Sequence, residues 1–135
     1  MEKQIILMSH GMMAQEVLNS AKMIVGDQIN YPVVCMTPDD GIDGTMTKLN
    51  QILSELPEDK EVIVIADLLG GTPANVASMK AAERPHLKVV TGMNLGMVLE
   101  SFFLLDSNHL AEQLVNIGSQ GVSIVGTKVI DSEDE

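Results

Sequence analysis

The chain has 135 residues, of which 45% are hydrophobic and 20% are charged, and its formal net charge is −11. A chain of this length and apolar content forms one domain with a substantial core, which excludes a largely disordered protein. The acidic balance argues against nucleic acid as a partner, because nucleic-acid binding depends on a basic surface. It favours a basic protein partner instead.

The sequence lacks the usual signs of a membrane or secreted protein. No apolar stretch approaches the roughly 18 residues that a membrane helix needs, and the N-terminus has no signal-peptide core. The single cysteine, Cys35, cannot form a disulfide within one chain and suits a reducing compartment. We therefore expect a cytoplasmic protein with no direct membrane insertion.

Strand-like and helix-like patterns alternate along the chain. Apolar runs typical of strands buried on both faces cover residues 3–8, 31–36, 61–66 and 87–90. Apolar residues at helical spacing predict helices over residues 14–25, 46–56, 73–82, 95–105 and 109–117. Residues 121–130 resemble a fifth strand, and residues 131–135 an acidic, frayed tail. This order predicts one α/β domain over residues 1–130, a doubly wound and mainly parallel sheet of order 2-1-3-4 with helices on both faces.

The first chemically informative residue is His10, which follows the first apolar run and precedes Gly11. A histidine at this point lies at the C-terminal edge of the sheet, where open α/β sheets bind ligands. Its imidazole is both nucleophilic and basic near neutral pH. A lone loop histidine more often has no function, so His10 gains weight only from its neighbours in space.

Asp67 follows the third predicted strand, and a glycine-rich loop leads from it into the next helix. Gly70 and Gly71 permit a tight turn and a close approach of backbone N–H groups to a ligand. Thr72 is predicted to be the helix N-cap and Pro73 the first helical residue. The free N–H groups at this helix start form a candidate anion site.

The predicted topology brings His10, Asp67 and the amides of residues 70–72 into one cleft, because neighbouring parallel strands end at the same edge. A carboxylate beside an imidazole fixes its tautomer and leaves the other nitrogen free as a nucleophile. Amides and a hydroxyl can hold phosphoryl oxygens. The predicted chemistry is phosphoryl transfer to and from a histidine, without a metal or an organic cofactor. Thr91 and Asn94 reach the same edge and are expected to support the site, as is Gly11.

Three motifs stand at the ends of the first, third and fourth predicted strands. They are Ser-His-Gly at residues 9–11, Asp-Leu-Leu-Gly-Gly-Thr-Pro-Ala-Asn at residues 67–75 and Thr-Gly-Met-Asn-Leu-Gly-Met at residues 91–97. In order and spacing they resemble the enzyme IIA domains of the mannose family, which belong to the bacterial phosphoenolpyruvate-dependent sugar phosphotransferase system. The resemblance covers essentially the whole chain.

This resemblance implies a phosphocarrier function for the chain. His10 would accept a phosphoryl group, with Nε2 favoured, from the histidine-containing phosphocarrier protein and pass it to a IIB component for sugar uptake. Asp67 would orient His10, and Gly71 and Thr72 would contact the phosphate. The family's homodimer is built partly by exchange of a C-terminal strand, here drawn from residues 121–130. A IIB domain is expected on another polypeptide.

Two positions depart from the family pattern. Leu69 stands where some relatives carry tryptophan, and Ala74 where many carry phenylalanine. Both changes leave the histidine and the carboxylate intact but alter the expected docking surface for partners.

Two other functions stay open. A receiver domain, phosphorylated on aspartate, would share the fold and would use Asp67, Thr91 and Lys128. It also needs an acidic pair after the first strand to bind Mg²⁺, where this chain has Ser9 and His10. A sister group of the IIA family donates phosphate to dihydroxyacetone kinase, although the Gly-Gly-Thr-Pro run at residues 70–73 resembles the sugar branch more closely.

Overall fold

The computed structural model describes residues 1–126 and contains one parallel sheet whose four strands lie in the order β2-β1-β3-β4. The strands are β1 (Gln4–His10), β2 (Val33–Met36), β3 (Val62–Ala66) and β4 (Leu87–Val90). Every residue of β3 is buried, because helices cover both faces of this central strand. The predicted doubly wound sheet of order 2-1-3-4 is confirmed.

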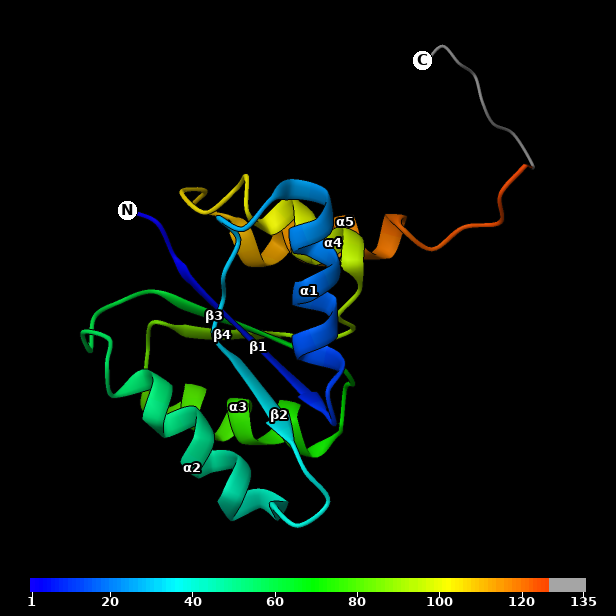
Figure 1. Ribbon diagram of the computed structural model, residues 1–135. Helices are drawn as coiled ribbons and strands as arrows, with labels where there is room; N and C mark the ends of the chain where they lie inside the picture. Colours follow the sequence, from blue (N-terminus) through cyan, green and yellow to red (C-terminus); the bar gives the residue numbers. More distant parts are fainter. Residues whose placement is uncertain (127–135) are drawn as a thin grey trace.

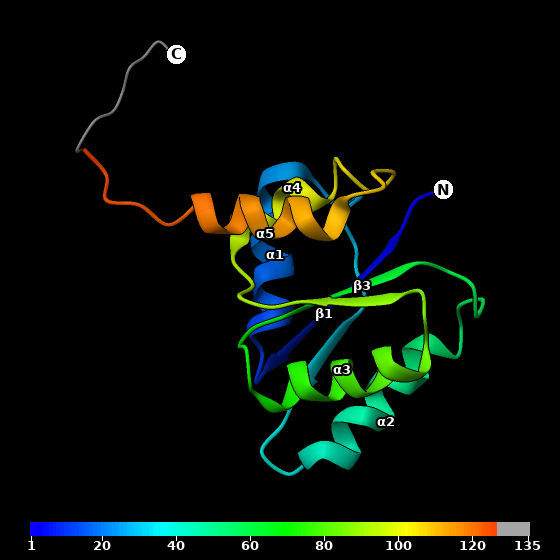
Figure 2. The ribbon, with the colours of Figure 1, turned by 180° about the vertical axis from the view of Figure 1, so that it is seen from behind.

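The five helices within residues 1–126 form two layers, one on each face of the sheet (Figures 1 and 2). One layer contains α1 (Met13–Val25), α4 (Leu95–Ser101) and α5 (Leu110–Gln120), and the other contains α2 (Gly41–Leu53) and α3 (Thr72–Glu83). Alternate residues of β1 supply the two cores, since Ile5 and Leu7 pack towards the first layer and Ile6 and Met8 towards the second. Within residues 1–126, no helix is long and apolar enough to cross a membrane.

The register of the sheet determines where the functional edge lies. Met8 pairs with Ala66 on one side, and His10 pairs with Met36 on the other. The chain then leaves β1 towards α1 and leaves β3 towards α3, on opposite faces of the sheet. This divergence places His10 and Asp67 at the type of switch point where doubly wound sheets bind ligands.

The predicted and observed helix boundaries differ most at the start of α2 and at the end of α4. The second helix begins at Gly41 rather than near residue 46, because its first turn is exposed and carries little apolar periodicity. The fourth ends at Ser101 rather than at residue 105, and the chain continues through tight turns. At that end the buried Ser101 hydroxyl hydrogen-bonds both the Val98 carbonyl oxygen and the Tyr31 hydroxyl.

The fifth strand predicted over residues 121–130 is not formed at residues 121–126 within the single chain, where this segment consists of turns and irregular structure and does not join the four-stranded sheet. Strand geometry needs backbone partners, and this segment leaves the end of α5 away from the sheet (Figure 2). Val122 and Val125 are exposed there. The remainder of the predicted strand and the acidic tail lie outside the described residues.

Candidate functional site

His10 and Asp67 form the centre of the site at the C-terminal edge of the sheet. The imidazole Nδ1 lies 2.8 Å from Asp67 Oδ2, and the backbone N–H of His10 donates to the same oxygen at 2.9 Å. Because a carboxylate only accepts hydrogen bonds, Nδ1 carries the proton and Nε2 retains its lone pair. The His10 side chain is 44% exposed, whereas that of Asp67 is only 9% exposed. The pair therefore combines a buried carboxylate with an accessible imidazole.

The second oxygen of Asp67 also bears on the chemistry. Oδ1 is buried and has no hydrogen-bond partner among the described residues. The backbone N–H of Asp67 itself donates to the Met8 carbonyl at 3.1 Å, which fixes the start of this loop against β1. With both donors to the carboxylate coming from His10, Asp67 is arranged to stabilise positive charge on that imidazole.

Gly71 lies directly against the ring of His10. A Cβ atom at this position would lie 2.6 Å from His10 Cε1 and 3.4 Å from Nε2, so only glycine leaves room for the ring in its observed place. The preceding Gly70 has a φ of +87°, which few side chains tolerate. The N–H of Gly71 donates to the Leu68 carbonyl at 3.1 Å. Gly71 therefore contributes close approach and not a free N–H donor.

The start of α3 differs in one detail from the prediction. Thr72 is the first helical residue and Gly71 occupies the N-cap, with no side-chain hydrogen bond to the cap. The prediction that Thr72 is the N-cap was wrong by one position, because glycine also serves as an N-cap. Within the described residues the Thr72 hydroxyl makes no hydrogen bond, and the backbone amides of Thr72 and Ala74 have no acceptor. The helix start thus retains donors for an anion.

The predicted supporting residues have separate structural roles. Gly11 has a φ of +56°, and its N–H donates to the Met36 carbonyl at 2.8 Å. The Asn94 side chain accepts from the Met97 N–H and donates to the Gly118 carbonyl, so it caps α4 and ties it to α5. Neither Asn94 nor Thr91 is hydrogen-bonded to His10 in the part of the chain that the structure describes.

Ser9 is a functional candidate that the sequence argument did not identify. Its side chain is fully buried, accepts the Ala14 N–H at 2.7 Å and donates to the Gly11 carbonyl at 3.1 Å. These two bonds close the turn that carries His10 from β1 into α1. The only signal in the sequence was a hydroxyl residue directly before the histidine. Its burial follows from the strand register, which residue types alone do not give.

A second loop borders His10 on the β2 side. Lys48 donates to Asp40 Oδ2 at 2.7 Å and to the Cys35 carbonyl at 3.0 Å. The hydrogen bond from Lys48, reinforced by the Thr37 N–H, holds the pKa of Asp40 below its usual range. The ion pair fixes the loop between β2 and α2 next to the end of β1.

Exposed apolar side chains follow both His10 and Asp67 along the chain. They are Met12, Met13, Leu68 and Leu69, and Leu69 is 81% exposed. Single exposed apolar residues are ordinary, but a group on the two loops that carry His10 and Asp67 is typical of a protein-docking surface. No group of three or more His, Cys, Asp or Glu side chains in residues 1–126 is placed to hold a metal ion.

The family profile described as "PTS system fructose IIA component" matches residues 4–117 of this chain. The chain belongs to the mannose-type IIA family of the sugar phosphotransferase system. The match extends from the first strand to the last helix and includes both loops of the site.

Individual IIA proteins agree with this assignment. The fructose-specific EIIA component of Bacillus subtilis is 32% identical over 113 residues, which cover 84% of this chain and 77% of that protein. The mannose-specific EIIAB component of Escherichia coli K12 is 28% identical over 131 residues, which cover 94% of this chain. The chain spans 41% of that EIIAB relative's length.

A solved structure shows the same IIA fold. The mannose/sorbose-specific IIA subunit from Enterococcus faecalis superposes with a TM-score of 0.87 at 41% sequence identity. The superposition covers 97% of this chain and 100% of that one. The parallel sheet and its two helical layers are therefore those of a phosphotransferase-system IIA domain.

Proposed function

We propose that this IIA domain is a cytoplasmic phosphocarrier that accepts a phosphoryl group on His10 Nε2 and passes it to a IIB component. The donor is the histidine-containing phosphocarrier protein. The observation that carries the proposal is the hydrogen bond of 2.8 Å between His10 Nδ1 and Asp67 Oδ2. It leaves Nε2 with its lone pair on a ring that is 44% exposed.

The first transfer is an in-line displacement at phosphorus. The Nε2 lone pair of His10 forms a new N–P bond while the N–P bond to the donor's histidine breaks, and the donor ring takes back the electron pair. His10 becomes positively charged because Nδ1 keeps its proton. Asp67 stays hydrogen-bonded to the Nδ1 proton throughout and balances the positive charge. In the second transfer the N–P bond of His10 breaks as the IIB component bonds to phosphorus, and Nε2 takes back the electron pair.

The oxygens of the transferred group need donors that do not have to rearrange. The Thr72 hydroxyl and the amides of Thr72 and Ala74 have this character, since the described structure gives them no internal acceptor. They lie at the N-terminus of α3, where the helix dipole favours negative charge. Gly71 allows the phosphoryl group to approach this helix start alongside the ring.

Both partners are proteins in this proposal, and the surface around His10 supports that assignment. Met12, Met13, Leu68 and Leu69 provide exposed apolar area on the two loops of the site. The surrounding chain is strongly acidic, which favours a donor and a recipient with basic docking faces.

The proposal is tested by intact mass after incubation with phosphoenolpyruvate, enzyme I and the histidine-containing phosphocarrier protein. We expect a gain of one phosphoryl group that is lost in acid and retained in mild alkali. His10→Ala should abolish the gain, and His109→Ala, a surface histidine away from the site, should retain it. Asp67→Asn, which keeps the shape but removes the charge, should lower the rate at least tenfold.

Phosphorylation of the His10→Ala variant by the same donor would refute the assignment. Acetyl phosphate with Mg²⁺ distinguishes the receiver alternative, because an aspartyl phosphate formed on Asp67 is labile in both acid and alkali. Transfer to dihydroxyacetone kinase, and not to a IIB component, would place the chain in the sister group.

A further inference from the structure

A hollow at the opposite edge of the sheet from His10 has no part in the carrier reaction. It lies where β3 and β4 begin and where α5 starts, and its volume is about 330 Å³. That volume is within the range of sites for small ligands, roughly 300–1,000 Å³. Ten residues line it: Lys3, Glu61, Val62, Ile63, Pro85, His86, Lys88, Asn108, Leu110 and Ala111.

The charge of this hollow is opposite to that of the molecule. The chain has 19 acidic and 8 basic side chains, yet the hollow contains Lys3 and Lys88 and a single carboxylate, Glu61. Lys3 is held in place, with its side chain 8% exposed and its Nζ 3.6 Å from Glu61. The ammonium group of Lys88 has no ion-pair or hydrogen-bond partner in the described part of the chain, although its backbone pairs with β3. The hollow therefore carries one uncompensated ammonium group, that of Lys88, beside the Lys3–Glu61 ion pair.

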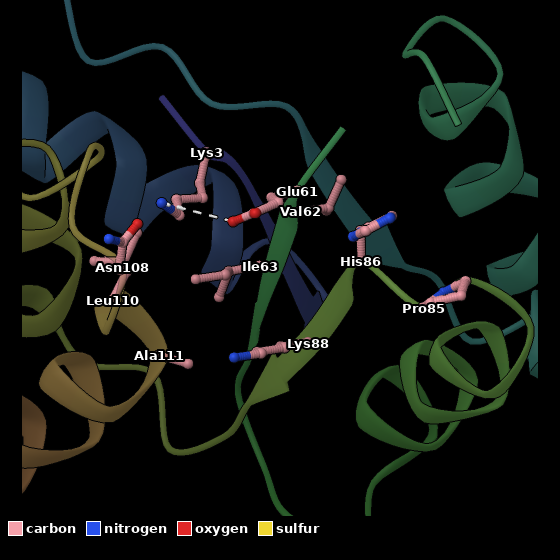
Figure 3. Close-up of a pocket in the computed structure, with 10 residues that line it drawn as sticks. All are labelled: Lys3, Glu61, Val62, Ile63, Pro85, His86, Lys88, Asn108, Leu110 and Ala111. Carbon is pink, nitrogen blue, oxygen red and sulfur yellow. Dashed lines mark ion pairs between the residues drawn. The ribbon is translucent and has the colours of Figure 1, made fainter. Parts of the chain in front are cut away.

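Polar side chains reach the hollow from several sides. In Figure 3, Lys3 reaches in from above, Lys88 from below and Asn108 from the side of α5, with Ile63 between them. Leu110 and Ala111, from the first turn of α5, complete the apolar wall. The accessible lining of the hollow is mainly polar, which suits a ligand rich in oxygen atoms better than an apolar one.

We propose that this pocket binds a small phosphate ester that carries hydroxyl groups. The two ammonium groups provide the charge and the hydrogen-bond donors that a phosphate needs. Glu61 and Asn108 offer oxygen acceptors for hydroxyl groups, which a bare anion would not use. A short carbon skeleton would contact mainly Ala111, because Ile63 and Leu110 are almost fully buried. This inference does not depend on the proposed function, because no residue of the pocket belongs to the His10 site.

The test is a ¹H–¹⁵N NMR titration of the full chain with glucose 6-phosphate, with glucose and inorganic phosphate in parallel. We expect saturable shifts at the amides of Lys88, Leu110 and Ala111, and none at His10 or Gly71. Both control compounds should bind at least about tenfold more weakly, since each lacks one half of the recognised chemistry.

Two variants connect the shifts to the pocket. Lys88→Gln should weaken binding about tenfold or more, because it removes a charge-assisted contact at an exposed strand position. Lys60→Gln removes a lysine outside the pocket and should leave the affinity unchanged, as should His10→Ala. Asn108→Ala should lower the affinity for glucose 6-phosphate but not for inorganic phosphate.

The proposal is wrong if glucose 6-phosphate causes no saturable shift, or if Lys88→Gln binds as tightly as the unmodified chain. Equal affinity for inorganic phosphate would also overturn it, since that result describes a simple anion site. Shifts centred on His10 and Gly71 would assign the binding to the carrier site instead.

Discussion

Gly71 determines how closely the backbone can approach the His10 imidazole. Its own φ of −82° is ordinary, so an alanine there would not strain the chain. The conflict is with the ring alone, 2.6 Å from the added methyl group at Cε1. The ring cannot move away freely because Nδ1 is bound to Asp67. A substitution at Gly71 should therefore change the geometry of the His10–Asp67 pair and leave the stability of the fold nearly unchanged.

We expect Gly71→Ala to displace the His10 ring and to lower the rate of phosphoryl acceptance at least tenfold. The free energy of unfolding should change by less than about 1 kcal/mol. The His10 Cε1–Hε1 NMR signal measures the displacement without requiring any activity.

Gly96→Ala is the matched control, since its added methyl group would meet nothing closer than Asn94 Oδ1 at 3.7 Å. It should leave both the His10 signal and the rate unchanged. An unchanged His10 signal in Gly71→Ala would show that the ring has room to move.

Ser9 supports a second prediction at this scale. Removing its hydroxyl leaves the N–H of the fully buried Ala14 without an acceptor. We expect Ser9→Ala to lower the free energy of unfolding by about 1–3 kcal/mol, measured by equilibrium urea denaturation. Ser119→Ala, which loses an exposed bond to the Val115 carbonyl, should change it by less than about 0.5 kcal/mol. Equal losses in the two variants would contradict the structural role of Ser9.

At the scale of the elements, one buried hydrogen bond joins parts of the chain that are far apart in sequence. The Tyr31 hydroxyl, just before β2, lies 2.7 Å from the Ser101 hydroxyl at the end of α4. Burial raises the pKa of Tyr31 to about 12, and the hydrogen bond with Ser101 opposes this only in part. The folded chain therefore holds the phenolic proton more tightly than the unfolded chain.

The buried Tyr31 hydroxyl predicts a specific dependence of the free energy of unfolding on pH. Its contribution to stability is complete below about pH 10 and is lost as the pH rises from about 10 to 12. The chain has one tyrosine and no tryptophan, so tyrosinate absorbance measures Tyr31 alone. We expect a midpoint near 12 when folded and near 10 in urea. Tyr31→Phe should reduce the alkaline loss of stability, and a folded midpoint near 10 would contradict the prediction.

The sheet was predictable from the sequence because its strands are short apolar runs with both faces covered. The same reasoning places His10 and Asp67 at one edge, since parallel strands end together. It did not yield the start of α2 at Gly41, where the first turn is exposed and no periodicity marks it. Nor did it yield the contact of Gly71 with the ring, which depends on a three-dimensional approach and not on a residue pattern.

At the scale of the whole molecule, residues 121–126 present an apolar surface outside the four-stranded sheet. Val122 and Val125 are exposed there, and β4 is an edge strand of the sheet. Exposed apolar chain and an open strand edge are complementary features in two copies of one protein. We therefore propose a homodimer in which this segment contributes to the contact.

Sedimentation equilibrium tests the homodimer directly. We expect the unmodified chain to sediment as a dimer and the double variant Val122→Asp, Val125→Asp as a folded monomer, because two buried carboxylates would oppose the contact. Met79→Asp changes an exposed apolar residue on α3 and should remain dimeric. A monomeric unmodified chain would exclude the homodimer.

The accessible nitrogen of His10, Nε2, lies at the edge of the sheet between the loop that leads to α1 and the loop that leads to α3. If that nitrogen both receives and delivers the phosphoryl group, donor and recipient must occupy the same place in turn and can never be bound together. The kinetics should then be of the ping-pong type. An excess of unphosphorylated donor should slow delivery of the phosphoryl group to the recipient, because it occupies the same place. The ratio of donor to recipient in the cell would thus govern the flux through this protein, without any separate regulatory site.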